Sequence, residues 1–389
     1  MVAGGDCIGK NDGKIIFVPD ALPGEKLDIY ITGQKRDYQY GRIAGIVEPA
    51  PERVEPPCPF YGRCGGCNLQ IAGYGFQIEL KRMIVEDAFS RAGFRKFQEL
   101  PPVTVIAGEP WEYRSRFQFH RFLSPGGKGV TGLKARGAEA GTVSSGEPLR
   151  ENIVPVTDCP VAVRQIREFL RSDTFPGAKA GRFTVFAGDT VRGEDGRDIV
   201  LESNTSPICE VKLLGRKIRF DVRGFFQSNL PLMEQMITAV CDGLEGERVA
   251  DLYSGAGVFA LFLQERFAKT VLVEQNRDAL GWAEINLAGR KHTSYGMSCR
   301  QWVLRPEAAE KFSAVVMDPP RSGLEAEVCR WLCGLGGTEL RYVSCNPVTL
   351  ARDAVKLAAG GFTLRELKLL DFYPQTSHIE CLAIFGRDR

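Results

Sequence analysis

Hydrophobic and polar residues alternate along the first 48 residues in the manner of short strands. Period-two alternation runs through residues 26–31 and 40–47, and an apolar run over residues 14–19 ends at a proline. Because successive side chains on a strand point to opposite faces, this pattern predicts strands with one buried face. Short strands at this spacing indicate an OB-type β-barrel over residues 1–48, a fold that often binds oligonucleotides. A barrel that only docks onto the next domain fits the same pattern.

The middle of the chain is strand-like between two short helical segments. Residues 49–57 hold four prolines and predict a linker. Apolar residues at helical spacing predict a helix over residues 77–92, ended by Gly93, and a second helix over residues 161–170. The rest of residues 101–222 is glycine-rich and strand-like. We therefore expect a strand-rich central domain over residues 58–222.

From residue 223 onward, strands and helices alternate. Strands are predicted over 248–253, 270–273, 313–317, 340–344 and 379–385, and helices over 258–267 and 348–358. This alternation is typical of a doubly wound parallel sheet. The sequence thus predicts a multidomain α/β protein whose third domain, residues 223–389, is Rossmann-like.

Composition and charge restrict the class of protein but do not identify it. The 389 residues are 44% hydrophobic and 25% charged, which is typical of folded globular protein and excludes a largely disordered chain. No apolar run reaches the roughly 20 residues that span a bilayer, so no membrane association is expected. The net charge of +2 does not indicate nucleic-acid binding. Twelve cysteines without a signal peptide predict a cytoplasmic protein, and no obligate protein partner is inferred.

Several polar and glycine residues follow the predicted strands of the third domain. The loop that contains Gly255 and Gly257 follows the first strand, Glu274 ends the second, and Asp318 follows the third. Ligands of open α/β sheets bind at these carboxyl ends, where an acidic side chain holds ribose hydroxyls. The loop lacks the third glycine of the dinucleotide fingerprint. The combination favours S-adenosylmethionine over a nicotinamide cofactor, although Asp318 as a simple strand-end cap fits as well.

Cys345 ends the fourth strand in a setting that suits a nucleophile. Asn346 and Pro347 start the next helix, and a helix N-terminus lowers the pKa of a thiol placed there, with Arg321 as a possible aid. A buried inert cysteine is the alternative. Glu380 and His378 lie in or beside the polar loop before the last strand, and either fits a general base.

These residues suit methylation of a pyrimidine at C5. A thiolate that adds to C6 makes C5 nucleophilic, C5 takes the methyl group, and a base then removes the C5 proton so that the thiolate leaves. The reaction needs one cysteine, one base and one methyl donor.

Four further cysteines form a separate set of candidate metal ligands: Cys58, Cys64, Cys67 and Cys159. Four thiolates suit either zinc or a [4Fe–4S] cluster, and their spacing alone does not separate the two. The Cys-x5-Cys-x2-Cys spacing with a fourth ligand differs from that of radical enzymes that use S-adenosylmethionine. We expect a structural site that attaches residues 58–67 to the central domain.

Residues 113–121 predict a strand with a polar, partly basic face. Arg114, Arg116, Gln118 and His120 share one face by period two. Such a row suits an RNA backbone, and a solvated outer face explains it equally well.

Taken together, the motifs resemble the RNA (uracil-5-)methyltransferase family, in particular its iron–sulfur branch that acts on ribosomal RNA. The resemblance covers nearly the whole chain and rests on the cysteine-rich segment 58–70, Phe226–Asn229, Asp251–Gly257, Asp318–Arg321, Ser344–Pro347 and Pro374–Glu380.

The resemblance implies roles for individual residues. Cys345 is similar to the family's nucleophile and Glu380 to its base, while the methyl-donor contacts match Gln227, Tyr253, Glu274 and Asp318. It also implies a class I methyltransferase domain, an N-terminal TRAM domain, S-adenosylmethionine and a [4Fe–4S] cluster. The implied substrate is a uridine of 23S ribosomal RNA, with transfer RNA as the alternative. Val258 departs from the family pattern, where several members have a polar residue.

Two other functions are compatible with parts of the sequence. An RNA-binding module without catalysis would keep the metal site but form no covalent adduct with 5-fluorouridine RNA. A cytosine-5 methyltransferase would usually carry Pro-Cys where this chain has Asp318 to Arg321.

Overall fold

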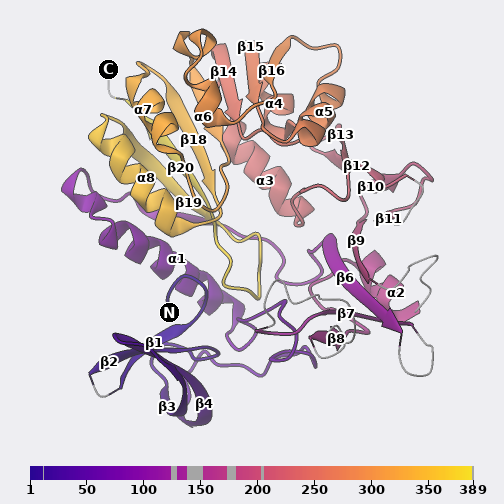
Figure 1. Cartoon of the computed structure of the whole chain (residues 1–389), viewed down its shortest axis with the longest axis vertical. Coiled ribbons are helices and arrows are strands. Elements are labelled where there is room, and N and C mark those ends of the chain that lie inside the picture. The colour runs from indigo at the N-terminus through magenta and orange to yellow at the C-terminus, as the bar shows by residue number, and fades with distance from the viewer. Residues whose placement is uncertain (12, 124–128, 138–151, 173–180, 203–205, 388–389) are drawn as a thin grey trace.

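The computed structural model describes residues 1–11, 13–123, 129–137, 152–172, 181–202 and 206–387. Its N-terminal part is a four-stranded sheet in the order β1-β2-β4-β3, lower left in Figure 1. The strands are β1 (Cys7–Asn11), β2 (Lys14–Val18), β3 (Lys26–Gln34) and β4 (Tyr38–Glu48). Ile16, Val18 and Ala21 form its small core, with Cys7 from β1. The alternation did not predict β1, because its residues are mostly polar or glycine.

The central part contains two antiparallel sheets. The larger one has the order β11-β9-β6-β7-β8 and the smaller one the order β10-β12-β13. Their strands are β6 (Arg116–Leu123), β7 (Gly129–Lys134), β8 (Ile153–Pro155), β9 (Gly181–Ala187), β10 (Val191–Gly193), β11 (Ile199–Leu201), β12 (Ile208–Leu213) and β13 (Arg216–Asp221). Helix α2 (Arg164–Ser172) starts three residues later than predicted, because Ala162 forms a backbone bridge with Arg114.

The C-terminal part is built on an eight-stranded sheet in the order β16-β15-β14-β17-β18-β20-β19-β5. The first five strands are parallel, and β20 runs antiparallel to both of its neighbours. The strands are β5 (Val103–Ile106), β14 (Gly246–Leu252), β15 (Phe267–Val273), β16 (His292–Tyr295), β17 (Ala314–Met317), β18 (Glu339–Ser344), β19 (Thr363–Leu370) and β20 (Glu380–Gly386). The Rossmann-like fold expected for this region is confirmed.

Helices cover the large sheet. They are α1 (Tyr74–Arg91), α3 (Leu230–Cys241), α4 (Val258–Leu263), α5 (Arg277–Asn286), α6 (Cys299–Trp302), α7 (Ala326–Gly334) and α8 (Pro347–Ala359), with 3-10 turns η1 (Phe94–Lys96) and η2 (Pro306–Ala309). The prediction that one helix runs from Val258 to Phe267 was wrong. The helix ends at Leu263 because Phe267 already pairs with Gly246 as the first residue of β15. Among the residues described, no helix is long and apolar enough to cross a membrane.

Two elements from the first third of the chain belong to the C-terminal sheet. Strand β5 pairs in parallel with β19, and α1 lies beside α8, as Figure 1 shows. Lys81 of α1 and Asp371, which follows β19, form an ion pair whose two side chains are fully buried. The range 58–222 expected for the central domain therefore includes a segment that packs with the C-terminal part. A buried ion pair and a shared strand explain this arrangement, and neither is visible in local sequence patterns.

Candidate active site

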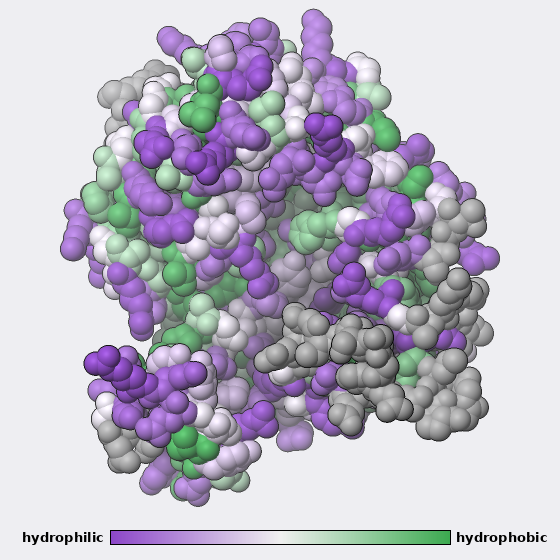
Figure 2. Space-filling model, viewed as in Figure 1, coloured by the Kyte–Doolittle hydropathy of each residue, from purple (hydrophilic) through white to green (hydrophobic). Residues whose placement is uncertain are grey.

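A cleft of about 1500 Å³ opens at the carboxyl ends of the parallel strands. Figure 2 shows that this face of the molecule is hollowed near its centre, between the upper part and the two lower parts. Of the residues expected from the sequence to bind the methyl donor or to catalyse, seven line the cleft: Gln227, Tyr253, Gly255, Glu274, Asp318, Cys345 and Glu380. The fold thus brings together residues that are up to 153 positions apart, from Gln227 to Glu380.

Gly257 is the one expected cofactor residue that does not line the cleft. It lies directly before α4 with a φ of +75°, and a Cβ atom there would come within 2.9 Å of the Cβ of Ala283 on α5. A glycine is therefore required at this position for close packing of the loop against α5. This explains the residue without any contact to a ligand.

The glycine loop is fixed by the acidic residue of the next strand. The backbone N–H of Gly255 donates to Oε2 of Glu274 over 3.0 Å, and the N–H of Asn276 donates to Oε1 over 2.7 Å. Tyr253, which enters the loop, has a φ of +60°, an unusual value for a residue with a side chain. The Glu274 carboxylate therefore stands at the edge of the loop, where a nucleoside ribose binds in this class of fold.

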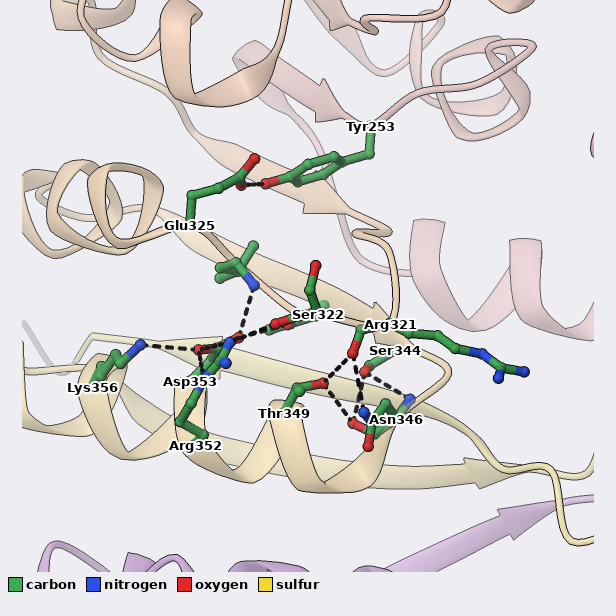
Figure 3. A network of polar contacts seen from close by, with 12 residues as sticks. Tyr253, Arg321, Ser322, Glu325, Ser344, Asn346, Thr349, Arg352, Asp353 and Lys356 are labelled. Carbon is green, nitrogen blue, oxygen red and sulfur yellow. Dashed lines mark hydrogen bonds and ion pairs between the residues drawn. The ribbon is translucent and has the colours of Figure 1, made fainter. Parts of the chain in front are cut away.

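Two further pairs of side chains shape the cleft. The hydroxyl of Tyr253 donates to Glu325, as Figure 3 shows, and the hydroxyl of Tyr373 donates to Oε1 of Gln227 over 3.2 Å. The pKa of Tyr373 is raised to about 12, chiefly by burial and then by Glu380, so its hydroxyl is protonated. Neither Glu325 nor Tyr373 was singled out from the sequence, because their position in the cleft depends on tertiary contacts.

Cys345 occupies the turn between β18 and α8, and that turn is tied to the Asp-Pro-Pro-Arg loop. Asn346 caps α8 by accepting from the N–H of Val348 over 3.1 Å, and its Nδ2 donates to the carbonyl of Arg321 over 3.0 Å. Thr349 donates to the same carbonyl over 3.2 Å. Figure 3 shows these contacts and the side chain of Arg321 extending away from them. The guanidinium group of Arg321 lines the cleft with Cys345.

Cys345 and Glu380 are brought together by strand register. Strands β18 and β20 are antiparallel, and Ser344 pairs with Cys381. Cys345 follows Ser344 and Glu380 precedes Cys381, so the two stand opposite each other where the ladder ends. Glu380 is only 2% exposed, and within the described part of the chain its Oε1 has no hydrogen-bond partner. A buried acceptor without a partner that faces a cleft suits contact with a bound ligand.

The electrostatics of this pair differ from the expectation for a thiol at a helix N-terminus. The pKa of Cys345 is raised to about 11, first by burial and then by Glu380 and Asp318, whereas Arg321 opposes the rise. Burial and the nearby Asp318 hold the pKa of Glu380 well above its ordinary value. Burial also raises the pKa of Asp318 to about 7. The prediction of a lowered thiol pKa was wrong for the protein alone, because burial, followed by the charges of Glu380 and Asp318, raises the pKa of Cys345.

His378 lies at the same cleft but in a different electrostatic state. Its pKa is lowered to about 4, because the surrounding protein disfavours the charged ring and Arg321, Lys81 and Arg114 add positive charge nearby. The imidazole is therefore neutral at pH 7, although it remains accessible to solvent from the cleft. Both His378 and Glu380 have access to the cleft, and the buried position opposite Cys345 favours Glu380 as the base.

The four cysteines of the separate set line one second cavity of about 420 Å³: Cys58, Cys64, Cys67 and Cys159. Their loop is joined to the central sheet by backbone hydrogen bonds, from the N–H of Gly65 to the carbonyl of Lys134 over 2.9 Å and from that of Arg136 to the carbonyl of Arg63 over 2.8 Å. Across the described residues, no three His, Cys, Asp or Glu side chains are arranged as ligands of a metal ion. The cysteines thus share a cavity without forming a compact single-ion site.

The polar face predicted for residues 113–121 is not a continuous exposed row. Gln118 is exposed, Arg114 and Arg116 are half-buried, and His120 is 7% exposed. Arg114 lines both the large cleft and the cysteine cavity, and its guanidinium group lies 4.7 Å from the ring centre of Phe117. Neither an open phosphate-binding row nor a solvated outer face describes this strand. Arg114 instead lies between the two cavities and lines both of them.

Family models match three parts of the chain. Residues 3–44 match the TRAM domain, residues 229–329 the methyltransferase small domain, and residues 308–387 the tRNA (uracil-5-)-methyltransferase model. The Pyrococcus abyssi tRNA (uracil-54, C5)-methyltransferase, solved with S-adenosyl-L-homocysteine, aligns with a TM-score of 0.70 and 19% identity over 95% of both chains. At this identity the alignment shows a shared fold.

Whole-length relatives show the family. An uncharacterized RNA methyltransferase of Treponema denticola is 35% identical over 100% of this chain and 98% of its own length. The 23S rRNA (uracil(1939)-C(5))-methyltransferases RlmD of Shewanella amazonensis and Chromohalobacter salexigens are 30% and 31% identical over 97% of this chain and 92% and 85% of their own. Because these similarities extend through the TRAM domain, the cysteine loop and the cleft, the chain belongs to the RNA (uracil-5-)methyltransferase family.

Proposed function

We propose that this protein transfers a methyl group from S-adenosylmethionine to C5 of a uridine in 23S ribosomal RNA, through a covalent bond between Cys345 and C6 of the base. The observation that carries the proposal is the position of Cys345 opposite Glu380 in the cleft that also contains the glycine loop and Glu274. The RlmD relatives, whose names specify uracil 1939 of 23S rRNA, support the choice of RNA.

The residues present fit the methyl donor. Glu274 stands beside the loop of Gly255 to accept ribose hydroxyls, and a Cβ atom at Gly255 would meet nothing within 4 Å, so the loop leaves open space. Three further residues line the same cleft and are proposed as contacts of the methyl donor: Asp318, Gln227 and Tyr253. When bound, S-adenosylmethionine supplies an electrophilic methyl group on a positively charged sulfur.

The side chains of the site divide the remaining work. The thiol of Cys345 would lose its proton to water in the cleft, and the thiolate would bond through Sγ to C6 of the uracil while the C5–C6 double bond opens towards C5. C5 would then bond to the methyl carbon that the donor supplies as that carbon's bond to sulfur breaks. The carboxylate of Glu380 then takes the proton from C5, the double bond re-forms, and the bond between Sγ and C6 breaks. Arg321 favours the thiolate by its charge.

The N-terminal sheet offers a surface for single-stranded RNA. Phe17, Tyr38 and Tyr40 lie on one face, with ring centres 5.5 to 6.0 Å apart. Lys10 of β1 and Arg42 of β4 are exposed on the same sheet. Aromatic rings among basic residues suit stacked bases and their phosphates. We name this set the aromatic face and propose that it binds RNA next to the target uridine, a role for which the TRAM match gives support.

We propose a [4Fe–4S] cluster for the cysteine cavity. Four thiols around one cavity form the donor set that such a cluster uses. A zinc ion, which would hold four sulfurs at about 2.3 Å from one point, is the alternative for the same four thiols. When bound, the cluster would supply a structural anchor between the loop of Cys58, Cys64 and Cys67 and the segment of Cys159.

A trapping experiment tests the proposed reaction. RNA that contains 5-fluorouridine has no C5 proton for Glu380 to remove, so the bond between Cys345 and C6 persists and the protein–RNA conjugate survives denaturing electrophoresis. Wild-type protein should form this conjugate only with the methyl donor present, and Cys345→Ala should form none. An absence of conjugate in the wild type would favour an RNA-binding module without catalysis. Mapping 5-methyluridine in cells with and without the gene distinguishes 23S rRNA from transfer RNA.

A further inference from the structure

The loop of residues 371–379, which leads into Glu380, is packed inside the protein along most of its length. Gln375 and Ser377 are 2% and 8% exposed. Gln375 has a φ of +68°, a conformation that costs energy for a residue with a side chain and that persists only when the surroundings hold it. Tyr113 donates to the carbonyl of Pro374 and Asn229 to that of Phe372, and three further segments of the chain contact the loop or the residue that holds Ser377.

The first contact comes from Asn68 and its neighbour Leu69, directly after Cys67. The backbone N–H groups of Asn68 and Leu69 both donate to the carbonyl of Gln375, over 3.1 and 3.0 Å. The Asn68 side chain accepts from the N–H of Ser377 over 2.8 Å and donates to its hydroxyl over 2.9 Å. A single asparagine therefore fixes both the backbone and the side chain of Ser377, three residues before Glu380.

The second contact comes from helix α1. The side-chain amide of Gln77 donates to Oε1 of Gln375 and accepts from the N–H of the same residue, each over 2.9 Å. One turn further along α1, Lys81 donates to the carbonyl of Tyr373 over 3.0 Å and pairs with Asp371. These bonds are buried, except for the partly buried bond to Tyr373, and they connect the start and the middle of the loop to α1.

The third contact comes from the N-terminal segment. The Nδ2 of Asn68 donates to the carbonyl of Gly4 over 3.2 Å. Gly5 has a φ of +96°, and a Cβ atom there would come within 2.6 Å of Nδ2 of Asn68 and 2.9 Å of Cβ of Ser377. Only glycine allows this approach. Asn68 is thus the point where the cysteine loop, the N-terminal segment and the 371–379 loop meet.

The position of Glu380 depends on the contacts of the 371–379 loop, because the β18–β20 strand pairing ends at the neighbouring residue Cys381. The ladder between β18 and β20 stops at Ser344 and Cys381, so Glu380 is held by strand pairing only to Leu370 of β19. We propose that Asn68 is a positioning residue that keeps the carboxylate of Glu380 in reach of the C5 proton. This proposal rests on the proposed function, and it assigns to the segment after Cys67 a part in product release.

The test separates formation of the covalent adduct from its resolution. In Asn68→Ala, conjugate formation with 5-fluorouridine RNA should stay within about twofold of wild type, because Cys345 lies on other elements. With ordinary uridine RNA, rapid quenching should show the adduct accumulating and product release at least fivefold slower. Asn68→Asp keeps the acceptor for the N–H of Ser377 and should give an intermediate release rate. Gln98→Ala is the matched control, because the Gln98 amide accepts from the N–H of Leu364 and donates to its carbonyl, at the other end of β19.

A second variant tests the same point without changing Asn68. Gly5→Ala should displace Asn68 and Ser377 and slow release in the same way. Gly24→Ala should leave it unchanged, because Gly24 has a similar φ of +87° with nothing within 4 Å of its Cβ position. Equal iron content and melting temperature in the Asn68 variants would show that the cysteine site is intact. Unchanged release, or equal slowing of formation and release, would overturn the positioning role. A wild-type protein that forms no conjugate would instead overturn the proposed function.

Discussion

Glu380 stands opposite Cys345 at the end of an antiparallel pair of strands and helps to hold the thiol in its neutral form. Burial is the larger cause, and together with Glu380 and Asp318 it raises the pKa of Cys345 to about 11. The charge of Arg321, which lines the same cleft, acts in the opposite direction and lowers this pKa. The free protein thus keeps its nucleophile protonated, and the positive charge of a bound methyl donor would favour the thiolate when both substrates are present.

The first prediction concerns the pH dependence of adduct formation. Below the pKa of Cys345 the thiolate fraction rises tenfold for each pH unit, so the rate of conjugate formation should increase from about pH 6 to about pH 9. Arg321→Ala removes the charge that lowers this pKa, and it should slow conjugate formation at pH 7 by roughly tenfold. Arg321→Lys should retain most of the rate. A wild-type rate independent of pH would contradict the raised pKa of the thiol.

Glu380→Gln should separate the two halves of the reaction. The amide has nearly the shape of the carboxyl group but does not accept the C5 proton, so methyl transfer should proceed while release slows by roughly 10² to 10⁴-fold. Quantifying the protein-bound methylated RNA over time measures this effect. His378→Ala serves as the control, and slower release in that variant than in Glu380→Gln would assign the base to His378.

The raised pKa of Glu380 also predicts how stability depends on pH. The folded protein binds this proton more tightly than the unfolded chain, so the stability from this group falls as pH rises above the unfolded pKa. In the Glu380→Gln variant the amide side chain is neutral in both the folded and the unfolded state. The melting temperature of Glu380→Gln relative to wild type should therefore increase between about pH 5 and about pH 8. Glu55→Gln changes an exposed carboxyl group and should show no such trend.

The sequence predicted the parts of the site that local patterns determine. Cys345 at a strand end before a Pro-initiated helix, and the glycine loop before Glu274, are visible because each motif lies within a few residues. Their common position follows from the parallel sheet, whose carboxyl ends meet at one edge. The role of Gly257 was predicted less well, because packing against Ala283 explains it without a ligand.

The parts that sequence patterns did not predict all depend on contacts between distant segments. Strand β5 is four residues long, and only its pairing with β19 shows that it belongs to the C-terminal sheet. Helix α1 carries Lys81, which is fully buried and forms an ion pair with Asp371. The two residues are 290 positions apart in the sequence, so no local pattern indicates the pair. The direction of the pKa shift of Cys345 was mispredicted because burial and the carboxyl groups of Asp318 and Glu380 around the thiol arise only in the folded structure. Sequence patterns predict individual helices and strands, whereas strand register and burial in the folded protein determine the pKa values of the site residues.

The aromatic face of the N-terminal sheet should contribute to RNA affinity. Tyr40 is 42% exposed, and its ring lies tilted against Phe17 and edge-on to Tyr38. Tyr40→Ala should weaken binding of single-stranded RNA by about 1–3 kcal/mol, the usual contribution of one stacked base. Phe97→Ala removes an aromatic side chain of similar exposure from another surface and is the control. Lys10→Ala should reduce the salt dependence of binding by about one phosphate contact. An unchanged RNA affinity in Tyr40→Ala would mean that the N-terminal domain only docks onto the next domain and does not bind RNA through this face.

The content of the cysteine cavity determines the last prediction. A [4Fe–4S] cluster would give roughly four iron and four sulfide per chain and a broad visible absorption, whereas zinc would give one colourless ion. Cys64→Ser removes one donor of the cavity and should therefore lower bound iron. It should also lower the melting temperature, because Cys67 and Cys159 would remain enclosed in the cavity without their bound cluster. Cys333→Ser changes a half-buried cysteine outside that cavity and should leave both unchanged. Stoichiometric zinc without sulfide would exclude the cluster, while the backbone bonds between Gly65 and Lys134 would still hold the loop to the central sheet.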